Sequence, residues 1–130
     1  MLDALRRHLK NPRTWQLALA GFWLALFIGT HIPSNVPILP KNNFDKVVHF
    51  TAFAALAMLL ATTWQVTAGH LTGRHLVVVW LVLVLYAALD EWTQILVRRE
   101  CSIWDWTADA LGAALALVLF AKLRSKYIAQ

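Results

Sequence analysis

The chain has 130 residues, of which 59% are apolar and 15% are charged, whereas soluble domains average about 45–50% apolar and about 25% charged residues. A soluble protein of this length has too little interior to bury so much apolar surface, so we expect an integral membrane protein. The net charge of +5 comes from basic residues that flank apolar segments, which is typical of membrane proteins and not of nucleic-acid binding. A single cysteine excludes an intramolecular disulfide.

A basic segment, residues 1–14, precedes the first apolar run. Residues 15–32 contain no Asp, Glu, Lys or Arg and are long enough for a membrane-spanning helix. A cleaved signal peptide would have a shorter apolar region, of about 7–15 residues, followed by an A-x-A-like site. We therefore expect an uncleaved first span. Residues 33–44 hold three prolines and three asparagines, which predicts a loop.

Three further apolar segments follow, joined by short polar connections. We expect each to be a membrane-spanning helix, and they comprise residues 45–68, 76–97 and 103–123. The valine-rich start of the middle segment would also suit a strand, but an unpaired strand in lipid leaves its backbone amides without partners. The prediction is an all-α integral membrane four-helix bundle, with one domain over residues 15–123 and a tail at residues 124–130.

The orientation follows from lysine and arginine near the span ends. Eight of these residues lie on the side of both chain termini, namely Arg6, Arg7, Lys10, Arg13, Arg74, Lys122, Arg124 and Lys126. The other side has four, namely Lys41, Lys46, Arg98 and Arg99. The positive-inside rule therefore predicts cytoplasmic N- and C-termini.

Ionisable residues within the predicted spans gather at the outward face of the membrane. Such residues are costly in lipid, so their presence indicates a partner or a function. They open the second span, close the third and open the fourth, and alternating span direction brings these three ends together. The candidate ligand-binding residues are Lys46, His49, Asp90, Glu91, Gln94, Arg98, Arg99, Asp105 and Asp109. We expect a polar pocket between the second, third and fourth spans.

Helical spacing aligns part of this group along the fourth span. Asp105, Asp109 and Gly112 fall at positions i, i+4 and i+7, on one helix face. Gly112 and Ala116 form a small-xxx-small pair below Asp109. Such a pair lets a neighbouring helix approach closely, so we expect helix packing at these two positions.

Three strings within these spans resemble the VanZ-like family. They are DKVVHFTAF at residues 45–53, DEWTQ at residues 90–94 and RRECSIWDWTADALG at residues 98–112. The family pattern pairs a Lys-His element, an acid-Gln element, and an Arg followed by Asp and Asn/Asp before Gly. The residues that match it here are Lys46, His49, Glu91, Gln94, Arg98 or Arg99, Asp105, Asp109 and Gly112. Asp109 stands where the pattern more often has Asn, which adds an acid to the group.

The resemblance covers residues 45–116 and implies a small multi-pass protein of the bacterial cytoplasmic (inner) membrane. The family takes its name from a protein linked to resistance to teicoplanin, which acts on cell-wall precursors at the outer surface. Resistance itself is not predicted for this chain. We expect recognition of an anionic envelope lipid, a lipid-linked precursor or an amphiphile. Membrane lipids are the expected partners, nucleic acid is not, and a homodimer is left open.

Two other interpretations of the polar residues stay open. In the first, Lys46, Arg98 and Arg99 pair with the nearby acids in a structural charge network. In the second, the protein is an enzyme acting on a lipid phosphate, with His49 as a base and Glu91 or Asp90 as its partner. His49 and Glu91 are the candidate catalytic residues. No nucleophile with an evident activating base is found, so whether the protein is an enzyme is left undecided.

A transporter would need polar residues that continue through the membrane, and the inner halves of the spans are almost purely apolar. No cofactor and no metal are expected, because no HExxH-like spacing occurs. A set of His49, Asp105 and Asp109 would in any case suit a hard ion better than zinc.

Overall fold

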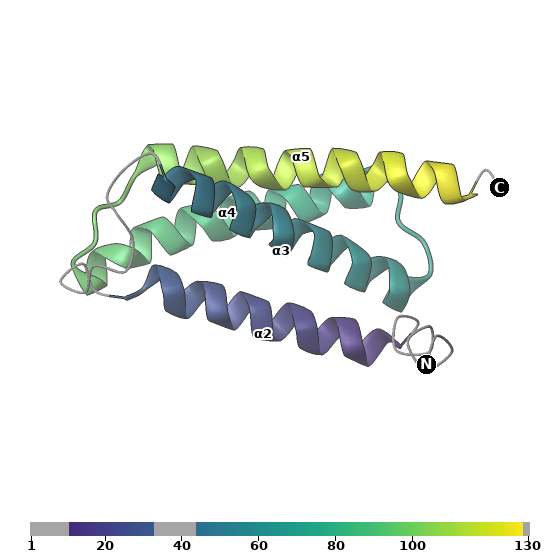
Figure 1. The fold of residues 1–130 in the computed structure, drawn as a ribbon, viewed down its shortest axis with the longest axis horizontal. Coiled ribbons are helices and arrows are strands. Elements are labelled where there is room, and N and C mark those ends of the chain that lie inside the picture. Colours follow the sequence, from purple (N-terminus) through teal and green to yellow (C-terminus); the bar gives the residue numbers. More distant parts are fainter. Residues whose placement is uncertain (1–10, 33–43, 129–130) are drawn as a thin grey trace.

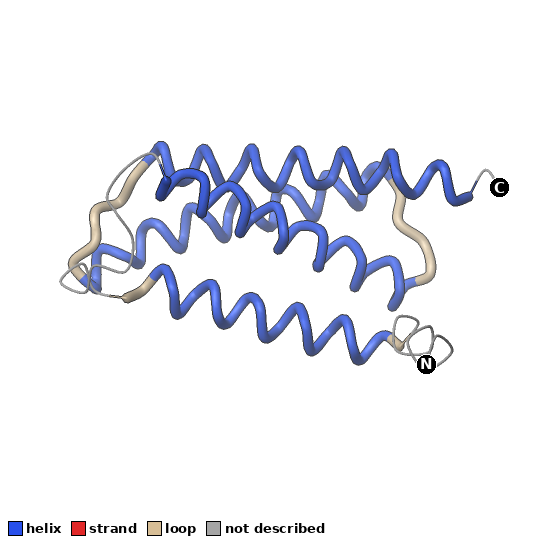
Figure 2. The backbone as a smooth tube through the Cα atoms, viewed as in Figure 1, coloured by secondary structure: helices blue, strands red, loops and turns tan. Residues whose placement is uncertain are grey.

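The computed structural model describes residues 11–32 and 44–128, with side chains up to residue 124. In these residues the chain forms four α-helices, one short 3₁₀ helix and no strand. In chain order they are α2 (Pro12–Thr30), α3 (Phe44–Ala68), α4 (Gly73–Gln94), η1 (Ile95–Val97) and α5 (Ile103–Ile128). The helices run lengthwise beside one another in alternating directions (Figures 1 and 2), so the ends of α2 and α4 lie with the starts of α3 and α5. The predicted all-α fold is confirmed.

Local signals place the starts of α2 and α4. The Asn11 Oδ1 atom accepts a hydrogen bond from the Arg13 amide at 3.0 Å, and Pro12 occupies the first turn, where its missing N–H costs nothing. At the start of α4, the Thr72 amide donates to His75 Nδ1 at 3.0 Å. Both contacts satisfy backbone donors that the first helical turn leaves without partners.

The chain leaves α4 through η1 and a left-handed residue. Arg98 has a φ of 61°, a conformation that is usually occupied by glycine. The amides of Arg98 and Arg99 donate to the carbonyl oxygens of Ile95 and Gln94, each at 3.1 Å. These bonds satisfy carbonyls at the helix end, and the reversal directs the chain through residues 98–102 into α5.

The closest helix pair is α3 with α5. A Cβ atom added to Gly112 would overlap the carbonyl oxygen of Phe50, so the two backbones meet at this point and no larger side chain fits. Below it, buried apolar side chains from α3, α4 and α5 form the core together with one from the α3–α4 turn. They are Leu56, Ala57, Ala61, Leu71, Val79, Leu83, Ala113, Ala116 and Leu117.

Two tryptophans link α4 to α5. Trp80 on α4 donates its indole N–H to the carbonyl oxygen of Ala110 at 3.0 Å, and Trp106 on α5 donates to that of Val84 at 3.2 Å. Each side chain therefore combines a large apolar surface with a hydrogen bond between helices.

Helix α2 lies at the edge of the bundle and packs chiefly on α3. It contributes no buried residue, and Leu17, Leu24 and Ile28 are exposed. Near its start, the Thr63 hydroxyl of α3 donates to the carbonyl oxygen of Trp15 at 3.2 Å. The outer surface of α2 therefore suits contact with lipid.

Three helical segments are long and apolar enough to cross a membrane. They are Phe44–Ala68, Gly73–Val97 and Ile103–Arg124. Many of their large apolar side chains are exposed, among them Leu85, Leu89 and Leu96, and a lipid environment would cover them. This surface and these spans indicate a multi-pass membrane protein. A crossing by α2, which corresponds to the first predicted span, remains a prediction.

The helix bounds follow the predicted spans, with differences at their ends. α2 begins at Pro12, earlier than predicted, because Asn11 caps it ahead of the apolar run. α4 begins at Gly73, inside the predicted polar connection between the second and third spans, and α5 continues to Ile128, into the predicted tail. Most of the predicted basic segment and of the proline-rich loop lies outside the described residues, as does Lys41.

Candidate functional site

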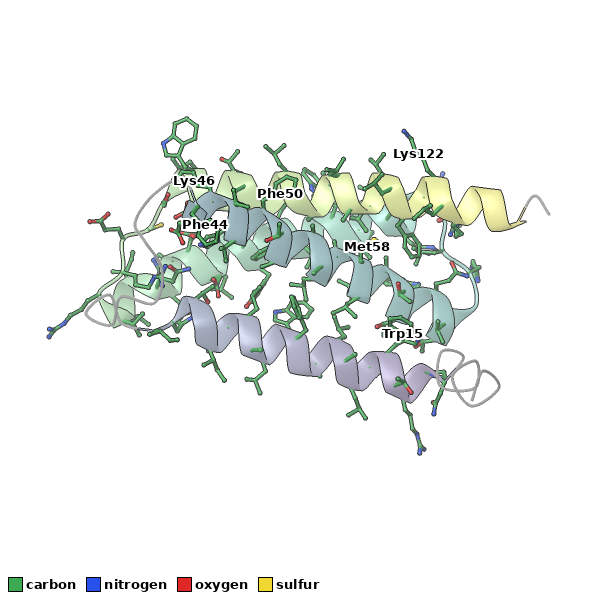
Figure 3. The ribbon with its side chains drawn as sticks, viewed as in Figure 1. Trp15, Phe44, Lys46, Phe50, Met58 and Lys122 are labelled. Atoms are coloured by element: carbon green, nitrogen blue, oxygen red, sulfur yellow. The ribbon has the colours of Figure 1, made fainter. Side chains whose placement is uncertain are left out.

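Buried polar side chains gather at one end of the bundle, where α2 and α4 end and where α3 and α5 begin. We call this group the polar end. Its members are Lys46, His49, Asp90, Glu91, Gln94, Asp105 and Asp109, and all but Lys46 are buried. Figure 3 shows Phe44 and Lys46 at this end, and Trp15 and Lys122 at the opposite one.

His49 and Asp109 join α3 to α5 inside the polar end. The His49 Nδ1 atom lies 3.1 Å from Asp109 Oδ1, within hydrogen-bonding distance, and both side chains are almost fully covered. The two residues can meet because Gly112, just below Asp109 on α5, lets the backbone of α3 come close. Because Asp109 and Gly112 share one face of α5, as predicted, the close approach at Gly112 brings Asp109 to His49.

Glu91 adds a second carboxylate beside this pair. Its Oε2 atom accepts a hydrogen bond from the Ser102 amide at 2.7 Å. Its Oε1 atom is buried and has no hydrogen-bond partner among the described residues. One potential metal-ligand atom from each of His49, Glu91 and Asp109 lies within 4.8 Å of the others. We call these three residues the His49 triad.

Lys46 and Asp105 form an ion pair nearer the surface. The distance from Lys46 Nζ to Asp105 Oδ1 is 3.2 Å, with the Lys46 side chain 43% exposed and that of Asp105 12% exposed. Asp105 lies in the first turn of α5, where the helix dipole favours an acid, and its amide approaches Ser102 Oγ at 3.3 Å. Asp45, His49 and Asp105 also bring potential ligand atoms within 4.8 Å of one another.

Asp90 on α4 contacts α2, the first helix, whereas the sequence predicted a pocket between the second, third and fourth spans. Its carboxylate accepts hydrogen bonds from Thr30 Oγ1 of α2 at 3.1 Å, from Tyr86 at 3.3 Å and from Gln94 Nε2 at 3.1 Å. His31 Nδ1 lies 3.8 Å from the same carboxylate. The expected grouping between the second, third and fourth spans is therefore incomplete, because the first helix supplies partners for Asp90.

Of these partners of Asp90, Gln94 was among the predicted site residues, whereas Thr30, His31 and Tyr86 were not. His31 is the only ionisable residue in the first predicted span, and it lies at the predicted outward end. Its Nε2 atom is 2.9 Å from Thr93 Oγ1 of α4. Tyr86 precedes Asp90 by four residues and so shares its helix face. Both signals were available in the sequence, but neither identifies a partner on another helix.

Arg98 and Arg99 lie outside the buried group. Arg98 is exposed and Arg99 is partly buried. Within the described part of the chain, Lys46 pairs with Asp105, His49 lies beside Asp109 and His31 lies near Asp90. The polar end thus buries four acids, namely Asp90, Glu91, Asp105 and Asp109.

An open hollow of about 400 Å³ lies beside the polar end, between α4 and α5. It is lined by Ala88, Glu91, Cys101, Ser102, Ile103 and Trp106. Of the predicted site residues, only Glu91 lines it. A pocket that holds all of the predicted residues therefore remains a prediction.

One known protein family matches most of the chain, including the residues described above. A family model described as VanZ/LLP1 matches residues 12–124, which include α2, α3, α4 and the whole polar end. No curated protein and no solved structure matches the chain. The resemblance inferred from the three strings of residues 45–112 is thereby confirmed, and the chain belongs to the VanZ/LLP1 family.

Proposed function

We propose that the polar end recognises the headgroup of an anionic envelope lipid, a lipid-linked precursor or a related amphiphile. The protein would lie in a bacterial inner membrane with the polar end outward and both termini in the cytoplasm. The concentration of costly ionisable groups at one end of an otherwise apolar bundle supports a functional role.

The observation that carries this proposal is the set of cations at the rim of the polar end. Lys46 opens α3 with its side chain 43% exposed, and Arg98 and Arg99 follow η1 at the same end of the bundle. Lysine and arginine bind phosphate through charge-assisted hydrogen bonds, and arginine does so with two parallel donors. Basic sites between membrane-spanning helices are a recurring solution for lipid headgroups. We call these three residues the rim cations.

The hollow beside the rim supports the same proposal. Its volume of about 400 Å³ lies within the usual range of small-molecule sites, about 300–1,000 Å³. Ser102 offers a hydroxyl, and Ile103 and Trp106 offer apolar surface. A headgroup could enter this space while its acyl chains lie along the apolar outer surface of α4 and α5.

A structural charge network is the second candidate function, and a different observation favours it. Most buried polar groups of the polar end already have partners within the protein, including the pairs His49–Asp109, Lys46–Asp105 and Gln94–Asp90. Such pairs can fix the arrangement of helices even where they add little net stability.

Native mass spectrometry of the purified full chain separates the two candidates. Lys46→Ala removes a rim cation. Arg98→Gly removes another at a left-handed position that glycine accepts without strain. Recognition predicts that both variants stay folded by circular dichroism and lose a co-purified anionic lipid that the wild type retains. Arg74→Ala, an exposed arginine at the opposite end, is the matched control and should retain it.

Other outcomes decide against recognition. An unchanged lipid complement in both folded rim variants would rule it out. A fall in abundance and thermal stability of His49→Ala, with no lipid lost from the rim variants, would favour the structural network. The enzyme alternative requires turnover of lipid phosphates that disappears in His49→Ala, and equal turnover in wild type and variant would dismiss it.

A further inference from the structure

The His49 triad combines three ligands from three different helices. His49 comes from α3, Glu91 from α4 and Asp109 from α5, and all three are buried. One ligand atom from each lies within 4.8 Å of the other two, a spacing that a single ion between them can bridge. Because each ligand belongs to a separate helix, no linear motif of the HExxH kind would reveal the group.

Glu91 provides an independent indication that these three residues bind an ion. Its Oε2 atom is satisfied by the Ser102 amide, whereas its buried Oε1 atom has no hydrogen-bond partner among the described residues. Buried carboxylate oxygens are rarely left unpaired, because their desolvation is not repaid.

The charges of the triad point to a cation. Glu91 and Asp109 supply two carboxylates, and His49 is the only basic side chain that pairs with either of them within the described residues. Burying an excess of negative charge is costly, and a divalent cation would neutralise it. We infer that His49, Glu91 and Asp109 bind one divalent metal ion, most suitably Mn²⁺ or Zn²⁺.

The donor set determines this choice of ion. An imidazole nitrogen suits zinc and other transition metals, whereas carboxylate oxygens suit manganese and magnesium. A set with one nitrogen and two carboxylates therefore favours an ion that accepts both. Three protein ligands leave at least one coordination position for water or for an exogenous group, as in open metal sites.

The second group of ligand atoms, Asp45 with His49 and Asp105, is the weaker candidate. Asp105 already pairs with Lys46 at 3.2 Å, and Asp45 is only partly buried. Nothing in this group corresponds to the unpartnered oxygen of Glu91. The inferred metal site does not depend on lipid recognition, and each can be correct without the other.

Metal binding by the purified full chain in detergent tests the inference. After chelation and desalting, the protein is titrated with MnCl₂ and separately with ZnCl₂, and bound metal is measured by calorimetry and elemental mass spectrometry. We expect one ion per chain in the wild type. Glu91→Gln and Asp109→Asn keep the side-chain shape, and each should weaken binding at least about tenfold.

Two controls and one competing variant make the result decisive. His70→Ala and Glu100→Gln change exposed residues of the same types and should bind metal as the wild type does. Asp105→Asn should weaken binding less than either triad variant does, because Asp105 supplies no ligand to the inferred site. A loss confined to Asp105→Asn would place the ion at the other group and overturn the inference. Absence of bound Mn²⁺ and Zn²⁺ in the wild type, or wild-type affinity in folded Glu91→Gln, would also overturn it.

Discussion

Asp90 shows how one buried acid can be satisfied without a full ion pair. Its two carboxylate oxygens accept from a hydroxyl of α2, a phenol one turn earlier on α4 and an amide one turn later. Hydrogen bonds to a charged acceptor are stronger than those between neutral groups. Asp90 therefore both occupies a buried position and ties the edge helix to the bundle.

We expect Asp90→Ala to destabilise the protein more than the loss of any one of its donors. The substitution leaves Thr30, Tyr86 and Gln94 without their acceptor, so the free energy of unfolding should fall by about 2 kcal/mol or more. Thr30→Val removes one donor and should cost about 1 kcal/mol. Thermal unfolding in detergent, followed by circular dichroism, measures both changes.

The double variant shows whether the two residues interact directly. If Thr30 acts through Asp90, adding Thr30→Val to Asp90→Ala should cost clearly less than it does in the wild type, with a coupling of about 0.5 kcal/mol or more. Full additivity of the two losses would contradict the hydrogen bond between α2 and α4.

The residues of the polar end were predictable, whereas some of their partners were not. Ionisable side chains in apolar spans stand out, and alternating span direction brings Lys46, His49 and Asp109 to one end. A helix that faces lipid on one side and a protein core on the other is apolar on both, so its sequence does not fix its rotation. The contacts of Asp90 with Thr30 therefore required the structure.

At the scale of helices, the spans themselves could be predicted because each long apolar run leaves helix as the only way to satisfy its backbone in lipid. Local capping decides the starts of α2 and α4, at Asn11 and Thr72. At the other end of the chain, α5 continues past its predicted end at residue 123 to Ile128. Gly112 and Ala116 predicted that another helix packs closely on α5 at these positions. The small-residue pattern does not indicate that this helix is α3.

Gly112 should be the most sensitive glycine of the described chain. In Gly112→Ala the new methyl group would overlap the backbone of Phe50, so α3 and α5 must separate. Overpacking of this kind costs about 1–3 kcal/mol, and it would also pull His49 away from Asp109. We expect lower thermal stability and, if the triad holds a metal, weaker metal binding.

Gly21→Ala is the matched control for this substitution. A Cβ atom at Gly21 meets no atom within 4 Å, and alanine has the higher helix propensity, by about 1 kcal/mol. Its thermal stability should equal or exceed that of the wild type. Equal losses in the two variants would show that the α3–α5 approach is not the cause.

At the scale of the whole molecule, α2 is held to the other helices by polar contacts near both of its ends. The Thr63 hydroxyl donates to Trp15 near the start of α2, and Thr30 donates to Asp90 at its end. Between these points α2 buries no residue completely. In lipid, where apolar contact between helices gives little net driving force, such hydrogen bonds and close packing hold helices together.

The polar asymmetry of the bundle makes its orientation testable with a native residue. Cys101 is the only cysteine, is exposed, and lies in the α4–α5 connection at the polar end. If that end faces outward, a membrane-impermeant maleimide should label Cys101 in intact cells. Cys101→Ser is the unlabelled control.

The opposite end supplies the matched position. In the Cys101→Ser background, His70→Cys puts a thiol in the exposed α3–α4 turn, which the positive-inside rule assigns to the cytoplasm. This thiol should react only after the cells are permeabilised. If instead His70→Cys is labelled in intact cells and Cys101 only after permeabilisation, the rim cations face the cytoplasm. They could then not bind a headgroup in the outer leaflet, which would contradict the proposed function.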